Sequence, residues 1–123
     1  MLCLDWLGMD SDVIRGHLEG LILAVLLADG AAHGYAIIRA LREHSGGEFD
    51  LPEGSIYPAL HRMERSGLIK SSWSQASGRP RRIYAITGRG RTHLDRERRD
   101  WRRFVSAAEA VFGLTPRGSA ASG

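Results

Sequence analysis

The stretch Gly54-Ser-Ile-Tyr-Pro-Ala-Leu-His-Arg-Met-Glu-Arg-Ser-Gly-Leu-Ile69 decides the fold of this chain. Ile56, Leu60 and Met63 recur at helical spacing, which predicts a helix with one face turned toward a core. The residues predicted on the opposite face are aromatic or cationic: Tyr57, His61, Arg62 and Arg65. Gly67 follows at a position typical of a helix end. The stretch therefore predicts a short helix that presents a polar surface to a partner.

Pro58 bears on where this helix begins, because proline has no N–H and its ring clashes with the preceding turn in a helix interior. With Ser55 as the N-cap, Pro58 would be the third helical residue, where the missing donor has no intrahelical partner. A start at Pro52 would instead require a kink. We therefore expect the helix to begin after Ser55.

A small basic hairpin is predicted after this helix. Residues 69–75 and 81–87 have the composition of two strands, and residues 76–80 that of a tight loop. The run Arg79-Pro-Arg-Arg82 lies at the tip. A helix with a polar face followed by a basic hairpin is the pattern of a winged helix-turn-helix that meets a DNA duplex.

Three further helices are predicted, at about 13–29, 33–44 and 88–112, with Ser11 or Asp12 capping the first and Thr87 the last. Residues 21–28 are apolar on every side, so we expect a second subunit to cover part of the first helix. The last helix carries one apolar stripe of roughly heptad spacing: Leu94, Trp101, Phe104, Val105, Ala108, Val111 and Phe112. The expected organisation is a flexible leader over 1–11, a winged helix-turn-helix domain over 12–87, a dimerisation helix over 88–113 and a disordered tail over 114–123. The fold class is thus mainly α with a small β-hairpin.

Composition narrows the class of protein. The hydrophobic content of 43% and charged content of 25% are ordinary for a globular chain. The longest apolar run has eight residues, too short for a spanning helix, and the N-terminus lacks a secretory pattern, so we expect a cytoplasmic protein. Residues 79–103 hold ten arginines against three acidic residues, whereas residues 1–53 hold nine acidic residues against three arginines. The basic end contains the predicted hairpin, which favours an anionic partner.

Catalytic and metal-binding patterns are missing from the sequence. No His is paired at helical spacing with a second His or Cys, and neither a nucleophile elbow nor a phosphate-binding loop is present. We therefore expect no enzyme, no metal and no cofactor. Between Arg89 and Arg103, the arginines are interspersed with Asp95, Glu97 and Asp100. This pattern favours intrahelical ion pairs on a solvated face.

The motifs His33-Gly34-Tyr35, Leu51 to Leu60, Arg62-Met-Glu64, Gly67-Leu-Ile69 and Arg81-Arg-Ile-Tyr84 together resemble the PadR family of bacterial transcriptional regulators. The resemblance covers about residues 15–112. It implies a dimeric winged helix-turn-helix repressor whose third helix enters the major groove of an inverted-repeat operator in double-stranded DNA. It also implies a homodimer formed by the first and last helices, with planar aromatic effectors binding near the interface.

These considerations assign residues to three sites. The predicted DNA-binding residues are Ser55, Tyr57, Pro58, His61, Arg62, Lys70, Arg79, Arg81 and Arg82. The predicted dimer interface consists of Leu21, Val25, Leu94, Trp101, Phe104, Val105, Ala108, Val111 and Phe112, with Trp101 also the candidate effector-binding residue. Two alternatives stay open: a winged-helix module that binds a protein partner and no DNA, and a protein that acts primarily as a small-molecule sensor.

Overall fold

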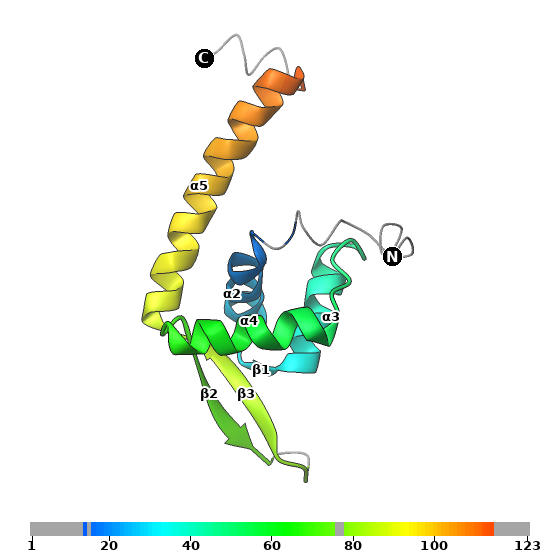
Figure 1. The fold of residues 1–123 in the computed structure, drawn as a ribbon, viewed down its shortest axis with the longest axis vertical. Coiled ribbons are helices and arrows are strands. Elements are labelled where there is room, and N and C mark those ends of the chain that lie inside the picture. Colours follow the sequence, from blue (N-terminus) through cyan, green and yellow to red (C-terminus); the bar gives the residue numbers. More distant parts are fainter. Residues whose placement is uncertain (1–13, 15, 76–77, 115–123) are drawn as a thin grey trace.

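The computed structural model describes residue 14 and residues 16–75 and 78–114. The elements in chain order are α2 (Leu18–Asp29), β1 (Ala32–His33), α3 (Gly34–His44), α4 (Glu53–Arg65), β2 (Ile69–Ser74), β3 (Arg81–Ile86) and α5 (Gly88–Phe112). Helices α2, α3 and α4 form a compact body, from which the β2–β3 hairpin and α5 extend in opposite directions (Figure 1). The predicted mainly helical winged fold is confirmed. The predicted leader, the Ser11 or Asp12 cap, and nearly all of the predicted tail lie outside the described residues.

Helix α2 is the centre of the body. It packs against α3, α4, α5 and β3. Ile22 and Leu23 are fully buried, and Leu21, Ala24 and Leu27 are partly buried against the same core. Most of the apolar surface of α2 is therefore buried inside one chain, and cover of the remainder by a second subunit stays a prediction.

The start of α4 differs from the prediction. Pro52, in extended conformation with φ −79° and ψ 160°, is the N-cap, and the N–H groups of Ser55 and Ile56 donate to its carbonyl. Leu51, just before it, is buried, so the core holds this end of the helix in place. Pro58 consequently lies inside the helix, where it leaves the carbonyl of Gly54 without its usual N–H donor. Gly54 is exposed, so water can satisfy that carbonyl, and Ser55 is not the cap.

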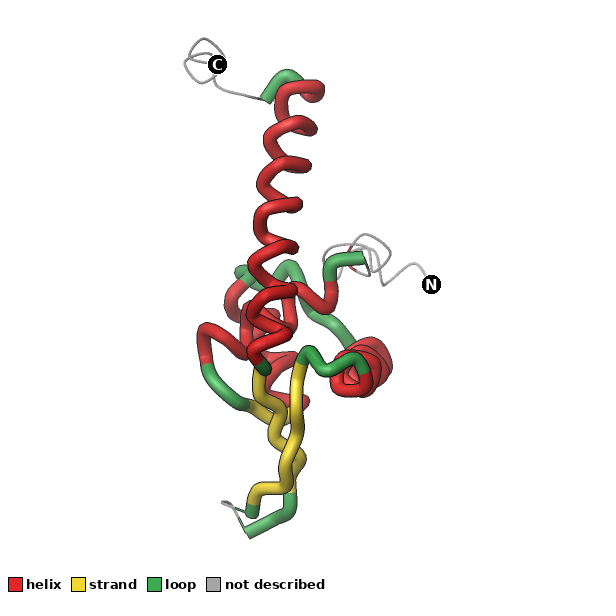
Figure 2. Tube along the Cα trace, turned by 90° about the vertical axis from the view of Figure 1, so that its left-hand side faces the viewer, coloured by secondary structure: helices red, strands yellow, loops and turns green. Residues whose placement is uncertain are grey.

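The sheet has three antiparallel strands in the order β1-β3-β2, one more than predicted. Strand β1 has only two residues, too few for an alternating pattern to reveal it, and it forms by pairing Ala32 with Tyr84 and His33 with Ile83. This pairing ties the start of α3 to the hairpin. The wing, defined as β2, β3 and their loop, extends beyond α4 as a narrow arm (Figures 1 and 2).

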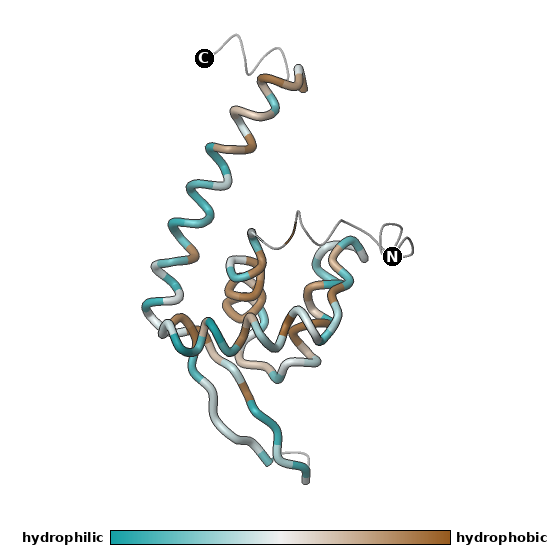
Figure 3. Tube along the Cα trace, in the orientation of Figure 1, coloured by the Kyte–Doolittle hydropathy of each residue, from teal (hydrophilic) through white to brown (hydrophobic). Residues whose placement is uncertain are grey.

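Helix α5 begins at the predicted cap: the Thr87 hydroxyl accepts a hydrogen bond from the Gly90 N–H at 3.0 Å and donates to the Gly67 carbonyl at 2.7 Å. Its first half packs on α2, where Leu94 is buried. Its second half projects from the body, and its hydropathy becomes more apolar toward the end (Figures 1 and 3). Within the described residues, no helix combines the length and apolar character needed to cross a membrane.

Candidate nucleic-acid interface

Helix α4 is held rigidly from one side. Ile56, Leu60 and Met63 are fully buried in the core, as their spacing predicted. This anchoring turns the other side of the helix to solvent, where Pro58, His61, Arg62 and Arg65 are exposed and Ser55 is half-buried. The first turn carries Glu53 and the last turn the two arginines, so the cationic end of the helix lies near the wing.

Tyr57 does not lie free on this surface, which corrects the sequence prediction. It is half-buried and packs against the core. Its ring lies over Gly34, where a Cβ atom would come within 2.5 Å of the ring and hydroxyl atoms. Gly34 is therefore required to let the start of α3 approach α4. This contact explains why the His33-Gly34-Tyr35 motif and Tyr57 occur in the same chain.

A cleft of about 330 Å³ lies where the start of α3, α4 and β3 meet. Its lining consists of His33, Gly34, Tyr35, Tyr57, Arg81, Arg82 and Tyr84. Three of these are tyrosines and two are arginines, so the cleft combines aromatic surface with hydrogen-bond donors and positive charge. Tyr35 is exposed beside it, with the Arg39 guanidinium 5.7 Å from its ring centre. Sequence reasoning used His33 and Tyr35 only as part of a motif and did not place them at the site.

Arg81 makes a close contact of 2.8 Å between its Nη1 atom and Nε2 of His33. The other ring nitrogen, Nδ1, accepts the Ala36 N–H at 3.2 Å and so caps α3. A neutral imidazole accepts through one nitrogen only, so both contacts cannot be hydrogen bonds at once. Burial and the nearby guanidiniums of Arg81 and Arg39 lower the pKa of His33, so the ring is neutral at pH 7. Arg81 thus contacts a neutral ring, and none of the ion pairs among the described residues includes it.

Arg82 is more firmly engaged. Its Nη2 atom lies 3.5 Å from a carboxylate oxygen of Glu64, and its guanidinium lies 5.3 Å from the ring centre of Trp73. The Ser71 hydroxyl donates to the same Glu64 oxygen at 2.5 Å. We call Glu64, Ser71, Trp73 and Arg82 the wing corner, since they join the end of α4 to both wing strands. Neither Glu64 nor Trp73 was predicted as a site residue, because the register that brings them to Arg82 cannot be read from the local pattern.

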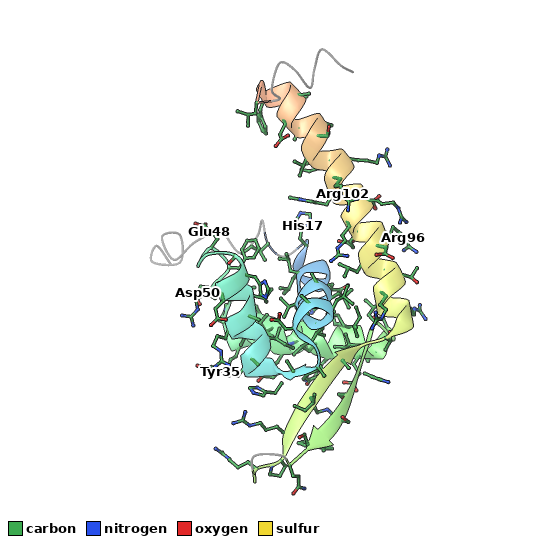
Figure 4. The ribbon with its side chains drawn as sticks, turned by 180° about the vertical axis from the view of Figure 1, so that it is seen from behind. His17, Tyr35, Glu48, Asp50, Arg96 and Arg102 are labelled. Atoms are coloured by element: carbon green, nitrogen blue, oxygen red, sulfur yellow. The ribbon has the colours of Figure 1, made fainter. Side chains whose placement is uncertain are left out.

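The two remaining predicted cationic contacts, Lys70 and Arg79, are exposed on the wing. Tyr35 lies at the end of α3 that faces the wing, whereas Glu48 lies at its opposite end (Figure 4). Arg62 and Arg65 of α4 are exposed as well, so positive charge dominates on the surface that α4 and the wing present. None of the ion pairs among the described residues of α5 joins an arginine to a carboxylate, although the sequence predicted such pairs. The ion pair present on this helix joins Nε2 of His93 to Oε2 of Glu97, 3.9 Å apart.

The predicted interface residues divide into two groups. Val25 and Leu94 are 5% and 3% exposed in the single chain, so they belong to its core and have almost no surface left for a partner. Leu21, Val105 and Ala108 are half-buried. Trp101, Phe104, Val111 and Phe112 are exposed by 49%, 63%, 85% and 74%. Trp101 also contacts the His17 ring edge-on, with the ring centres 5.0 Å apart. Figure 4 shows His17 beside α5.

A comparison with protein families matches residues 22–96 to the transcriptional regulator PadR-like family. The matched segment contains most of α2, all of α3, α4 and the wing, and the start of α5. The chain belongs to the PadR-like family. It is thus a member of a family of transcriptional regulators, and the resemblance inferred from its motifs is confirmed.

Solved structures of transcriptional regulators share this fold. A transcriptional regulator from Clostridium thermocellum superposes with a TM-score of 0.74 at 29% identity, covering 83% of this chain and 96% of that one. A PadR family transcription regulator from Clostridium difficile gives a TM-score of 0.66 at 37% identity, covering 78% and 97%. The transcriptional regulator Rv3488 of Mycobacterium tuberculosis is 38% identical over 72 residues, which are 58% of this chain and 64% of that protein.

Proposed function

We propose that this PadR-like chain is a homodimeric repressor that binds an inverted-repeat operator in double-stranded DNA. The proposal rests on one observation: the exposed side of α4 and the basic wing lie next to each other and both face solvent. Helix α4 offers His61 and Arg62 while its opposite side is buried, and the wing offers Lys70, Arg79 and Arg81 beside it. A helix of this kind fits the major groove, and the arm reaches the adjoining backbone.

Two copies are needed because an inverted repeat presents two half-sites about 34 Å apart. The projecting half of α5 supplies the surface for pairing, since it holds Phe104, Val111 and Phe112 exposed on one helix. Monomeric proteins rarely leave such a continuous apolar surface to water. A two-fold arrangement through α5 would cover it on both copies at once.

The helix and the wing are expected to contribute differently to binding. His61→Ala or Arg62→Ala should weaken operator binding by about 1–3 kcal/mol and leave random duplex almost unaffected, because base-edge contacts carry sequence information. The Arg79→Ala, Arg81→Ala variant should instead weaken both duplexes equally and reduce the salt dependence of binding, because phosphate contacts do not depend on sequence. The measurement is fluorescence anisotropy with labelled duplexes over a salt series, using operator selected from genomic fragments.

Arg96→Ala, Arg102→Ala is the matched control for the wing variant, since it removes the same charge from α5, away from the wing (Figure 4). It should leave the salt dependence unchanged. A chain that binds a protein partner and no DNA would show almost no salt-dependent duplex binding at all. Equal loss on operator and random duplex for both α4 variants would show that the operator-reading surface lies elsewhere.

We also propose that a planar aromatic ligand at Trp101 releases the repressor. Trp101 lies between His17 and Phe104, with ring centres 5.0 Å and 6.0 Å away, so an apolar ring would find aromatic neighbours there. A ligand can weaken operator binding only if it prefers a dimer whose two α4 helices are differently spaced.

If a ligand at Trp101 releases the repressor, ligand binding and loss of operator affinity should occur together. Planar aromatic compounds that quench tryptophan fluorescence should lower operator affinity at least about fivefold, the lower end of ordinary allosteric coupling. Trp101→Ala should abolish both the quenching by those compounds and their effect on DNA. Ligands that quench the parent protein and leave operator affinity unchanged would contradict the effector role, and Trp101 would then be an interface residue only.

A further inference from the structure

Trp73 is an exposed aromatic residue that the fold leaves largely uncovered. Its side chain is 64% exposed on β2, where its strand neighbours Ser71, Ser72 and Ser74 are small and polar. Aromatic side chains contribute most when their surface is buried, and a buried one covers about 150–250 Å². An indole on a protruding arm is therefore a candidate contact residue, and sequence analysis did not single it out.

The strand pattern shows which side of the wing carries Trp73. Alternate residues of a strand share one face, so Ile69, Ser71 and Trp73 lie together. Ile69 is buried in the core and Ser71 donates to Glu64 of α4. Trp73 is thus on the wing face that turns toward α4, farther out along the arm. A duplex lying against the exposed side of α4 would meet this part of the wing.

Trp73 is also held in place before any partner arrives. It pairs across the sheet with Arg82, whose guanidinium lies 5.3 Å from the ring centre. Arg82 is in turn fixed by Glu64. A cation over an aromatic face is attractive, and an ordered side chain loses less conformational entropy on binding. The wing corner therefore presents the remaining indole surface and its N–H in a defined orientation.

We propose that Trp73 packs against a deoxyribose of the DNA backbone beside the groove occupied by α4, with its indole N–H donating to a phosphate. This inference rests on the proposed DNA binding. The sugars are the apolar part of the backbone, and an indole offers both an apolar face and one donor. The same arm also carries Lys70, Arg79 and Arg81 exposed, and this positive charge favours a duplex over a second protein chain. The contact is independent of sequence and strengthens binding to any duplex.

A random-sequence duplex tests this contact, since no operator is required. Trp73→Ala should lower affinity for a labelled 30-base-pair random duplex about tenfold, whereas the slope of log affinity against log salt stays unchanged because no cation is removed. Trp73→Phe should retain most of the affinity. Ser72→Ala is the matched control on the opposite face of the same strand and should bind as the parent does. Duplex should also quench the tryptophan fluorescence of the parent, and Trp73→Phe should lose that change.

The outcomes separate this inference from the proposed function. If the parent binds random duplex and Trp73→Ala binds equally well, or if the quenching persists in Trp73→Phe, the contact is wrong while DNA binding stands. If the parent binds no duplex, both are wrong. A melting temperature of Trp73→Ala close to that of the parent shows that its loss of affinity comes from the contact and not from unfolding.

Discussion

The Phe104→Asp, Val111→Asp double variant is expected to sediment as a folded monomer under conditions where the parent is a dimer. If α5 forms the proposed interface, dimerisation would bury two carboxylates from each copy, four in all, without partners, and burying an unpaired charge is unfavourable. A combined cost of about 4 kcal/mol raises the dimer dissociation constant about a thousandfold. Operator affinity should fall with it, because two linked copies reach both half-sites and one does not.

The body of the variant should stay folded, which the sequence pattern alone would not suggest. An apolar stripe that included Leu94 would make Phe104 and Val111 appear to be core residues, whose replacement by Asp unfolds the chain. In the structure their side chains are 63% and 85% exposed on the projecting part of α5. Circular dichroism and thermal melting should therefore show helical content near that of the parent.

The matched control places the same two charges on the other side of the helix. Ser106 and Ala110 are exposed and lie on the side of α5 away from Phe104. Ser106→Asp, Ala110→Asp should remain dimeric. A parent protein that sediments as a monomer at micromolar concentration, or a double variant that stays dimeric, would show that α5 does not form the interface.

Gly90→Ala is expected to destabilise the chain by about 3 kcal/mol, the upper end of the usual cost of overpacking. Gly90 is buried where the first turn of α5 approaches the segment between α4 and β2, and an added Cβ would overlap the Leu68 carbonyl oxygen. It would also lie 2.9 Å from Ile86 Cγ1 and 3.2 Å from Leu23 Cδ2. Because the nearest atom is backbone, relief requires α5 to move. The midpoint of thermal unfolding should fall by about 10–20 °C.

Gly88→Ala controls for the general effect of replacing a glycine in a helix. It lies two residues earlier in α5, with no atom within 4 Å of an added Cβ. Alanine favours helix over glycine by up to about 1 kcal/mol, so this variant should be as stable as the parent or more so. If Gly90→Ala and Gly88→Ala had the same melting temperature, α5 would not approach Leu68 as closely as the structure places it.

The sequence by itself determined the elements whose signals are local. Spacing identified the buried side of α4, because residues one turn apart share a face whatever surrounds the helix. Thr87 identified the start of α5, because its hydroxyl caps an N–H only three residues away. Composition identified the basic wing, and the combined motifs identified the PadR-like family.

The tertiary structure decided the contacts between distant segments. It placed the start of α4 at Pro52 rather than Ser55, since burial of Leu51 outweighs the cost of Pro58 inside the helix. It paired β1 with β3, brought Gly34 under Tyr57 and joined Glu64 to Arg82. It also separated Leu94, which is core, from Phe104 and Val111, which are exposed on the same stripe. A periodic pattern shows that a side chain needs cover, but which segment covers it depends on strand register and on how closely two backbones approach, and neither is encoded within a few neighbouring residues.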